Sequence, residues 1–201
     1  NRLDVAGFGE IDASLVDIGN AHIFVRAVDM GLTGTETAAE IDADESLSAN
    51  LERIRAHAGH MMGMIDDPAQ SKQESPATPL IAMIAPPHDY ESVIEGCTIK
   101  AADCDFLSRL MFMQQMHKTY AATSTVCTGI ASKLEGTIVY EACRAEAQSR
   151  VEVRIGHPAG VILTESDVEL DGNDCVVKRA TVGRTARKIM DGQVYVPEYR
   201  K

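Results

Sequence analysis

The stretch MHKTYAATSTVCTGIASKLEG, residues 116–136, combines residue types that could bind or protonate an anion. A histidine and a lysine stand directly before a segment of small and hydroxyl-bearing residues, and apolar residues then recur at the spacing of one helix face until Gly136. This pattern predicts a helix that begins between Ala122 and Ser124. Because the first backbone N–H groups of a helix have no partner within it, such a helix start can hold an anionic group.

Four side chains around this helix start are candidates for binding or proton transfer. Thr123 and Ser124 could add hydroxyl donors beside the free N–H groups, while His117 and Lys118 stand just upstream and could supply positive charge or move a proton. The alternative is that the helix is simply buried in the domain core and that its hydroxyl residues cap it, which is their ordinary role there. The pattern alone leaves both interpretations open.

Asn20 and His157 each stand where a strand pattern breaks. Asn20 follows a glycine in VDIGNAHIFV, so its amide could point into a cleft, or Gly-Asn could simply form a turn with a positive φ. In VRIGHPAGV, two glycines and a proline predict a hairpin turn with His157 at its tip. Neither pattern alone decides between a functional and a purely conformational role.

Two other clusters combine residue types that bind metals or anions. His57 and His60 are followed by three methionines, which could suggest a soft-metal site. Histidines three positions apart on an amphipathic helix are more often surface residues, so we predict no metal site. Arg184, Arg187 and Lys188 lie close together in an acidic chain and could bind a polycarboxylate or phosphate, or pair with nearby acidic residues.

The composition argues against several classes of function. The 201 residues carry a formal net charge of −11, whereas affinity for nucleic acid or anionic membranes needs clustered Lys and Arg. No apolar run approaches the roughly 18–20 residues of a membrane span, and the motifs of P-loop, Rossmann and serine-hydrolase proteins are missing. The five cysteines form no C-x-x-C pair, so neither a disulfide framework nor a zinc knuckle is favoured. We therefore expect a soluble protein of a reducing compartment, the cytoplasm.

One long helix is expected in the first half of the chain. Residues 42–65 begin with acidic residues and repeat apolar residues at helical spacing, on a core face formed by Leu47, Leu51, Ile54, Ala58, Met61 and Met62. Residues 66–79 are rich in Pro, Ser and charge, which indicates an exposed loop rather than a linker between domains.

The remaining segments are mostly strand-like. Residues 10–32 alternate apolar and polar residues around the Gly-Asn break, which predicts two strands or one strand with a bulge. A short buried strand is expected within residues 80–90, and residues 99–118 fit either a strand or a helix. Residues 136–144, 149–190 and 192–197 are mostly strand-like, with turns at 156–160 and 171–174. The order of the elements predicts an α+β fold with an antiparallel sheet.

Four longer motifs, in this order, resemble the C-terminal half of the PrpF family of methylaconitate isomerases and related enzymes: SLVDIGNAHIFVRAVDMGLTGTE, MHKTYAATSTVCTGIASKLEGTIV, VRIGHPAGVI and ATVGRTARKIMDGQVYVP. The resemblance covers nearly the whole chain. It implies the fold of diaminopimelate epimerase, in which two similar domains each wrap a curved, mostly antiparallel sheet around a central helix and the active site lies between them. Residues 1–201 would form the second domain, with the helix that starts near Thr123 as its central helix.

The same resemblance implies a reaction and a set of site residues. The family transfers a proton next to a carboxylate of an unsaturated di- or tricarboxylate without a metal or an organic cofactor. The expected ligand is therefore a small polycarboxylate of the aconitate or methylaconitate type. Asn20, His117, Lys118, Thr123 and Ser124 would line the second-domain wall of the cleft. This favours the anion-site interpretation of the helix start over simple capping.

The chain also departs from the family pattern. Ala159 stands where the family usually has Ser, so a hydroxyl contact is lost there. The lysine and the cysteine that the resemblance implies as acid and base belong to the first domain, and no cysteine here has the Cys-Gly-Asn setting of that site. Cys127 fits a core position inside the central helix.

Two expectations about the whole molecule follow from these departures. We expect isomerase chemistry of the intact protein, whereas this chain alone should be an inefficient enzyme that binds the missing half or self-associates. The alternative is a non-catalytic domain that keeps the fold for anion or partner binding.

Overall fold

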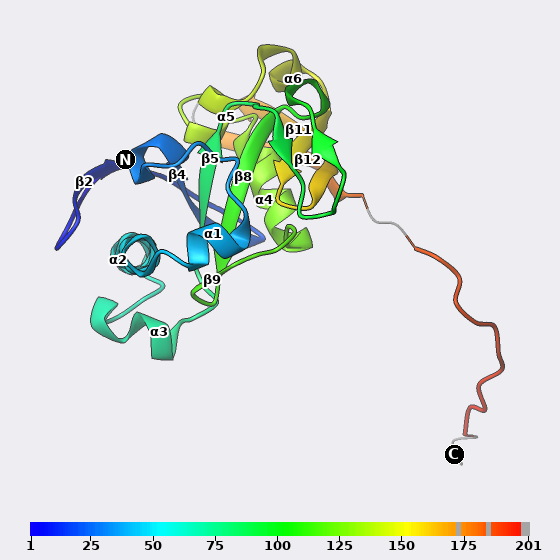
Figure 1. The fold of residues 1–201 in the computed structure, drawn as a ribbon, viewed down its shortest axis with the longest axis horizontal. Helices are drawn as coiled ribbons and strands as arrows, with labels where there is room; N and C mark the ends of the chain where they lie inside the picture. Colours follow the sequence, from blue (N-terminus) through cyan, green and yellow to red (C-terminus); the bar gives the residue numbers. More distant parts are fainter. Residues whose placement is uncertain (172–173, 184–185, 198–201) are drawn as a thin grey trace.

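Eight strands form one sheet in the computed structural model, which describes residues 1–171, 174–183 and 186–197 (Figure 1). Seven of them follow one another in the order β12-β11-β10-β8-β5-β4-β3, and β9 pairs with β8 outside this path. Their bounds are β3 (Ser14–Ile18), β4 (Asn20–Arg26), β5 (Leu80–Ala85), β8 (Phe106–Phe112), β9 (Gln115–Met116), β10 (Glu152–His157), β11 (Gly160–Asp171) and β12 (Asp174–Val182).

The sheet is mixed and mostly antiparallel. Neighbouring strands pair antiparallel except β4 with β5 and β8 with β10, which are parallel. The predicted α+β class is therefore confirmed. The Gly-Asn break separates two strands, because Gly19 takes a φ of 76° and Asn20 pairs with Ile18 directly across the turn.

Helix α4 (Ala122–Ala131) lies inside the curl of this sheet. It contacts β3 and β4 toward one edge and β10, β11 and β12 toward the other, so the strands wrap around it. Gly129 permits a close approach to β11, since a Cβ at that position would lie only 2.7 Å from Thr164 Cγ2. The apolar core between α4 and the sheet includes Phe24, Phe106 and Cys127. The predicted central helix is confirmed.

Helix α2 (Glu45–Met61), α1 (Ala38–Asp42) and the hairpin of β1 (Arg2–Val5) and β2 (Gly9–Asp12) share a second apolar core with the outer face of the sheet. Figure 1 shows α2 on the far side of β4, β5 and β8 from α4. Strand β5 serves both cores because its side chains alternate: Ile81 and Met83 belong to the core beneath α2, and Ala82 and Ile84 to the core around α4.

The predicted core face of α2 is correct except at its end. Its buried members are Leu47, Leu51, Ile54 and Ala58. Met61, which was expected on the same face, is 55% exposed because the helix ends at this residue, and Met62 is only partly buried.

The remaining elements are short. They are η1 (Ala27–Met30), η2 (Pro68–Gln70), α3 (Ser71–Glu74), β6 (Tyr90–Glu91), β7 (Thr98–Ile99), η3 (Ala101–Asp103), α5 (Ile138–Ala142) and α6 (Ala145–Ser149). The segment 66–79 is thus more ordered than the exposed loop that its composition indicated. The buried Arg55 guanidinium organises it by pairing with Glu52 at 2.7 Å and donating to the Ser75 and Pro79 carbonyl oxygens.

The strand predicted for residues 136–144 is wrong, because Ile138–Ala142 within them form helix α5. The β-branched residues favoured a strand, but Thr137 accepts a hydrogen bond from the Tyr140 N–H and so caps a helix start. Ile138 and Val139 are buried in the core around α4. Tertiary burial therefore outweighs the local preference of these residues.

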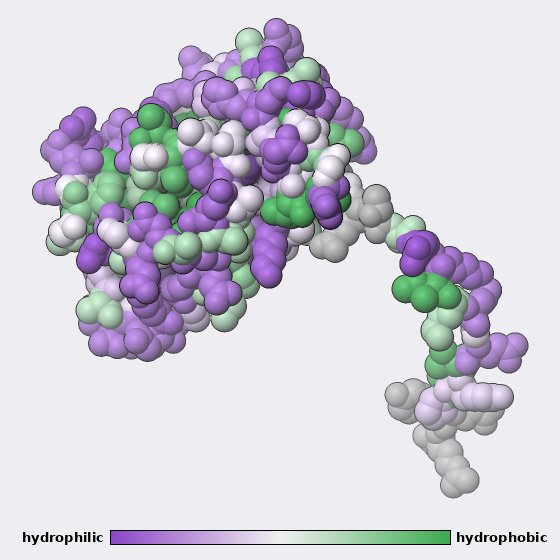
Figure 2. Space-filling view, in the orientation of Figure 1, coloured by the Kyte–Doolittle hydropathy of each residue, from purple (hydrophilic) through white to green (hydrophobic). Residues whose placement is uncertain are grey.

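Residues 186–197 extend away from the folded body without a helix or strand (Figures 1 and 2). The strand predicted at 192–197 is therefore not formed in the described part of the chain. Figure 2 shows hydrophobic (green) groups along this segment. Its Ile189, Met190 and Tyr195 are more than four-fifths exposed (88%, 84% and 93%). The centre of the predicted turn at 171–174 and residue Arg184 lie outside the described residues.

Candidate active site

Helix α4 begins without a side-chain cap. Its N-cap residue is Ala121, and no side chain accepts a hydrogen bond from the first turn there. The first helical hydrogen bond runs from the Thr125 N–H to the Ala121 carbonyl at 3.0 Å. Among the described residues, the backbone N–H groups of residues 122–124 are consequently without partners. The capping by Thr or Ser hydroxyls that the alternative interpretation expected is therefore not formed, and the anion site stays a prediction that the open N–H groups favour.

Two of the predicted site residues meet at this helix start. The Asn20 side-chain amide donates a hydrogen bond to Thr123 Oγ1 at 2.8 Å, although the residues are 103 positions apart. Asn20 is the first residue of β4, and the turn at Gly19 brings it to the sheet end that faces the start of α4. Thr123 is exposed, so its hydroxyl remains accessible to a ligand.

Ser124 occupies the same helical turn but is fully buried. Its exposed fraction is 0%, and its Oγ has no hydrogen-bond partner among the described residues. Burying a hydroxyl without a partner costs free energy. The Ser124 hydroxyl therefore has an unused hydrogen-bond donor beside the open N–H groups. The helix dipole adds partial positive charge at the same place.

His117 lies near a second histidine, His157. His117 is half-buried, and its Nδ1 accepts hydrogen bonds from the Thr119 N–H and hydroxyl at 3.2 Å each. His157 is not at the tip of its turn as expected. It is the last residue of β10 and 9% exposed, with its ring 6.5 Å from that of Tyr120. Burial, the Arg109 charge and His117 lower the pKa of His157 to about 4.

A neutral His157 adds no positive charge near pH 7. Its Nδ1 accepts a hydrogen bond from the Ala159 N–H at 3.2 Å, so its Nε2 carries the proton and can donate a hydrogen bond. Sequence patterning missed this arrangement, because the glycines and the proline around His157 signalled only a turn. No local pattern reports that Tyr120 and His117 come to lie beside it.

Lys118 lies apart from the other candidates. It is exposed and lines a hollow of about 550 Å³ together with Asp42, Glu45 and Lys72. The structure therefore brings Asn20, Thr123 and Ser124 together and puts Lys118 at a hollow whose other charged residues, apart from Lys72, are acidic.

A hollow of about 650 Å³ lies elsewhere. Arg26, the last residue of β4, and Ile84, near the end of β5, line it together with His88 and Glu141. These positions are at the opposite end of the strands from Asn20, and none of the predicted site residues borders the hollow. The predicted site therefore does not coincide with this hollow.

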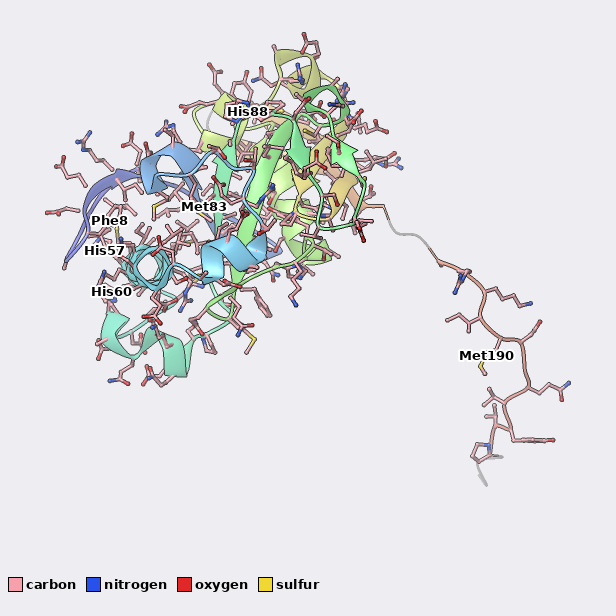
Figure 3. The ribbon with its side chains drawn as sticks, viewed as in Figure 1. Phe8, His57, His60, Met83, His88 and Met190 are labelled. Atoms are coloured by element: carbon pink, nitrogen blue, oxygen red, sulfur yellow. The ribbon has the colours of Figure 1, made fainter. Side chains whose placement is uncertain are left out.

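Metal-ligand residue types do not gather in the described residues, where no group of three His, Cys, Asp or Glu side chains has suitable spacing. Figure 3 shows His57 and His60 on the side of α2 away from the sheet, and the His60 Nδ1 hydrogen-bonds to the Ile65 carbonyl at 2.8 Å.

Cys127 is fully buried in the core, and burial raises the pKa of its thiol to about 12, so it is not a thiolate near pH 7.

Within the described residues, no helix combines the length and the apolar character that crossing a membrane requires.

Comparison with known proteins connects this chain to a family. Residues 1–197 match the PrpF family, described as "PrpF protein". A protein of Eubacterium barkeri named 3-methylitaconate isomerase is 48% identical over 94% of this chain and 48% of its own length. A protein of Shewanella oneidensis named 2-methyl-aconitate isomerase is 37% identical over 98% of this chain and 48% of its own length.

A solved structure confirms the fold. The crystal structure of methylitaconate-delta-isomerase matches with a TM-score of 0.86 and 46% identity, over 96% of this chain and 48% of that chain. The chain spans about half the length of the curated relatives it matches. These matches extend over nearly all its residues, and the chain belongs to the PrpF family.

Proposed function

We propose that this chain is the second domain of a two-domain, diaminopimelate epimerase-like isomerase that acts on an unsaturated di- or tricarboxylate of the methylitaconate or aconitate type. The open start of α4 carries the proposal, because three free N–H groups and the Asn20–Thr123 pair suit a carboxylate. Relatives that match nearly the whole chain bear the names of isomerases of such acids. Those names make the non-catalytic alternative the weaker one.

In this proposal the start of α4 holds a substrate carboxylate while a proton moves. A base removes a proton from the carbon next to the double bond, the electron pair shifts toward the carboxylate, and an acid returns a proton at the other end of the three-carbon unit. The double bond changes place and no oxidant or reductant is consumed. Fixed N–H donors stabilise the negative charge that builds up between the two proton transfers.

The acid and the base come from the other half of the full-length protein, where the family resemblance implies a lysine and a cysteine. Cys127 does not serve this role here, because its thiol is buried and protonated. The chemistry needs neither a metal nor an organic cofactor. We also propose a cytoplasmic location, in keeping with five cysteines that are all free thiols.

The partner in this proposal is the missing half. The extended segment 186–197 offers exposed apolar side chains for that contact, including Met190, which Figure 3 labels far from the folded body. Exposed apolar surface of this kind tends to find a partner. Self-association is the substitute when the other half is absent.

The test is an assay of the full-length protein and of residues 1–201 with cis-aconitate, trans-aconitate, 2-methylaconitate and itaconate, followed by ultraviolet absorbance. We expect the full-length protein to convert at least one of these acids and the chain alone to convert none at a comparable rate. A full-length protein inert toward all four acids would refute the proposed function. Equal activity of the chain alone would refute the two-domain cleft.

A further inference from the structure

His22 lies beside the candidate site, fully buried in β4 and stacked on Phe24 with ring centroids 5.5 Å apart. Its Nδ1 is 2.8 Å from the Asn20 carbonyl oxygen. A carbonyl only accepts hydrogen bonds, so Nδ1 carries the proton and donates it. In a neutral ring the other nitrogen, Nε2, is then an acceptor, and it has no partner among the described residues. Burial lowers the pKa of His22 to about 4, which keeps the ring neutral near pH 7.

Packing alone does not account for a histidine at this position. A phenylalanine would fill a similar volume, keep the stacking on Phe24 and avoid the cost of a buried nitrogen without a partner. The contact that phenylalanine would lose is the hydrogen bond to the Asn20 carbonyl.

We infer that His22 is a positioning residue, whose ring fixes the backbone of Asn20 so that the Asn20 amide reaches Thr123 at the start of α4. The two hydrogen bonds form one chain, from His22 Nδ1 to the Asn20 carbonyl at 2.8 Å and from the Asn20 amide to Thr123 Oγ1 at 2.8 Å. Asn20 needs this support because the preceding residue, Gly19, is exposed and has no side chain to restrain the turn. The inference rests on the proposed function, because Thr123 then orients toward a bound carboxylate.

Two substitutions separate positioning from packing. His22→Phe keeps the ring and removes the Nδ1 donor, whereas His22→Asn keeps a donor at nearly the same place as Nδ1 and removes most of the ring. A purely structural role predicts that the Asn variant is worse in both stability and substrate affinity. A positioning role predicts that His22→Phe loses substrate affinity but keeps its stability, and that His22→Asn loses stability but keeps its substrate affinity.

The experiment measures the melting temperature, kcat and KM of both variants in the full-length protein, with the acid that the wild type converts. We expect His22→Phe to be at least as stable as the wild type with KM raised roughly five- to tenfold and a smaller change in kcat, the size expected for one lost hydrogen bond. His22→Asn should be less stable with KM within roughly twofold of the wild type. Unchanged KM in His22→Phe, or KM that follows stability, would overturn the inference.

A crystal structure of His22→Phe keeps this test independent of turnover. Displacement of the Asn20 amide from Thr123 would sustain the inference even if the wild type converted none of the acids, an outcome that refutes only the proposed function. An Asn20–Thr123 hydrogen bond that persists at its present length would overturn the inference.

Discussion

In the proposed function, backbone N–H groups at the start of α4 hold a substrate carboxylate, and a nearby side-chain cation would strengthen that binding. Lys118 was predicted to be that cation, and its ammonium group lines a hollow shared with Lys72. If Lys118 reaches a bound carboxylate, Lys118→Ala should weaken binding by about 1.5–3 kcal/mol, against about 0–1 kcal/mol for an exposed charge. Calorimetry of cis-aconitate binding to the full-length protein measures this, with Lys72→Ala as the matched control. Equal, small losses would remove Lys118 from the site.

The two buried histidines make the stability of the chain depend on pH. The pKa of His22 and of His157 is lowered to about 4 in the folded state, chiefly by burial. Between the unfolded value of about 6.5 and the folded value, the unfolded chain binds protons that the folded chain does not. The stability they contribute is therefore complete above about pH 6.5 and is lost as the pH falls toward 4.

Urea unfolding at pH 7 and pH 5 measures this effect. Each histidine should lower the free energy of unfolding by up to about 1.4 kcal/mol per pH unit in this range. His22→Phe should remove one of the two contributions and so reduce the difference between the two pH values. If the variant shows the same difference in free energy of unfolding between pH 7 and pH 5 as the wild type, His22 takes up its proton in the folded chain within this range. This account of its environment is then wrong.

At the scale of residues, the sequence predicted individual candidate residues better than it predicted the contacts between them. Asn20, Thr123 and Ser124 were predicted individually, because a strand break and a hydroxyl-rich helix start are local patterns. The Asn20–Thr123 hydrogen bond spans 103 positions, and only the folded sheet creates it. The burial of His22 was missed because a histidine in a strand pattern carries no local sign of whether it faces solvent or core.

At the scale of elements, the fit of α4 against β11 sets the position of the site. A Cβ on Gly129 would lie 2.7 Å from Thr164 Cγ2 and closer still to Ser166 Oγ. Gly129→Ala should therefore destabilise the chain by about 1–3 kcal/mol, even though alanine is the better helix former by about 1 kcal/mol. Urea unfolding gives the difference, and Gly192→Ala is a control because nothing lies within 4 Å of its added Cβ. A Gly129→Ala variant as stable as the wild type would show that α4 is not held closely against β11.

The sequence predicted elements well where periodicity was long and poorly where it was short. Helix α2 and the strands β3, β4, β5, β10 and β11 follow clear apolar repeats and were anticipated. Helix α5 was not, since five residues are too few to distinguish periods of two and 3.6, and burial of Ile138 and Val139 decided the outcome.

At the scale of the whole molecule, the extended segment 186–197 is the feature that most favours the proposed association with a partner. Its exposed Ile189, Met190 and Tyr195 have no contact with the folded body to bury them. We expect residues 1–201 to self-associate or to bind the missing half, and a variant ending at residue 183 to do so much less. Sedimentation analysis of both, with and without the other half, provides the measurement. A monomeric chain without affinity for the other half would argue against this assembly, as would equal association of the shortened variant.

The measurement that tests the central claim most directly is a crystal structure of the full-length protein soaked with 2-methylaconitate or cis-aconitate. The account predicts a carboxylate within about 3.2 Å of backbone N–H groups of residues 122–124, close to the Thr123 hydroxyl and the Asn20 amide. A ligand bound elsewhere, with those N–H groups in contact only with water, would contradict it.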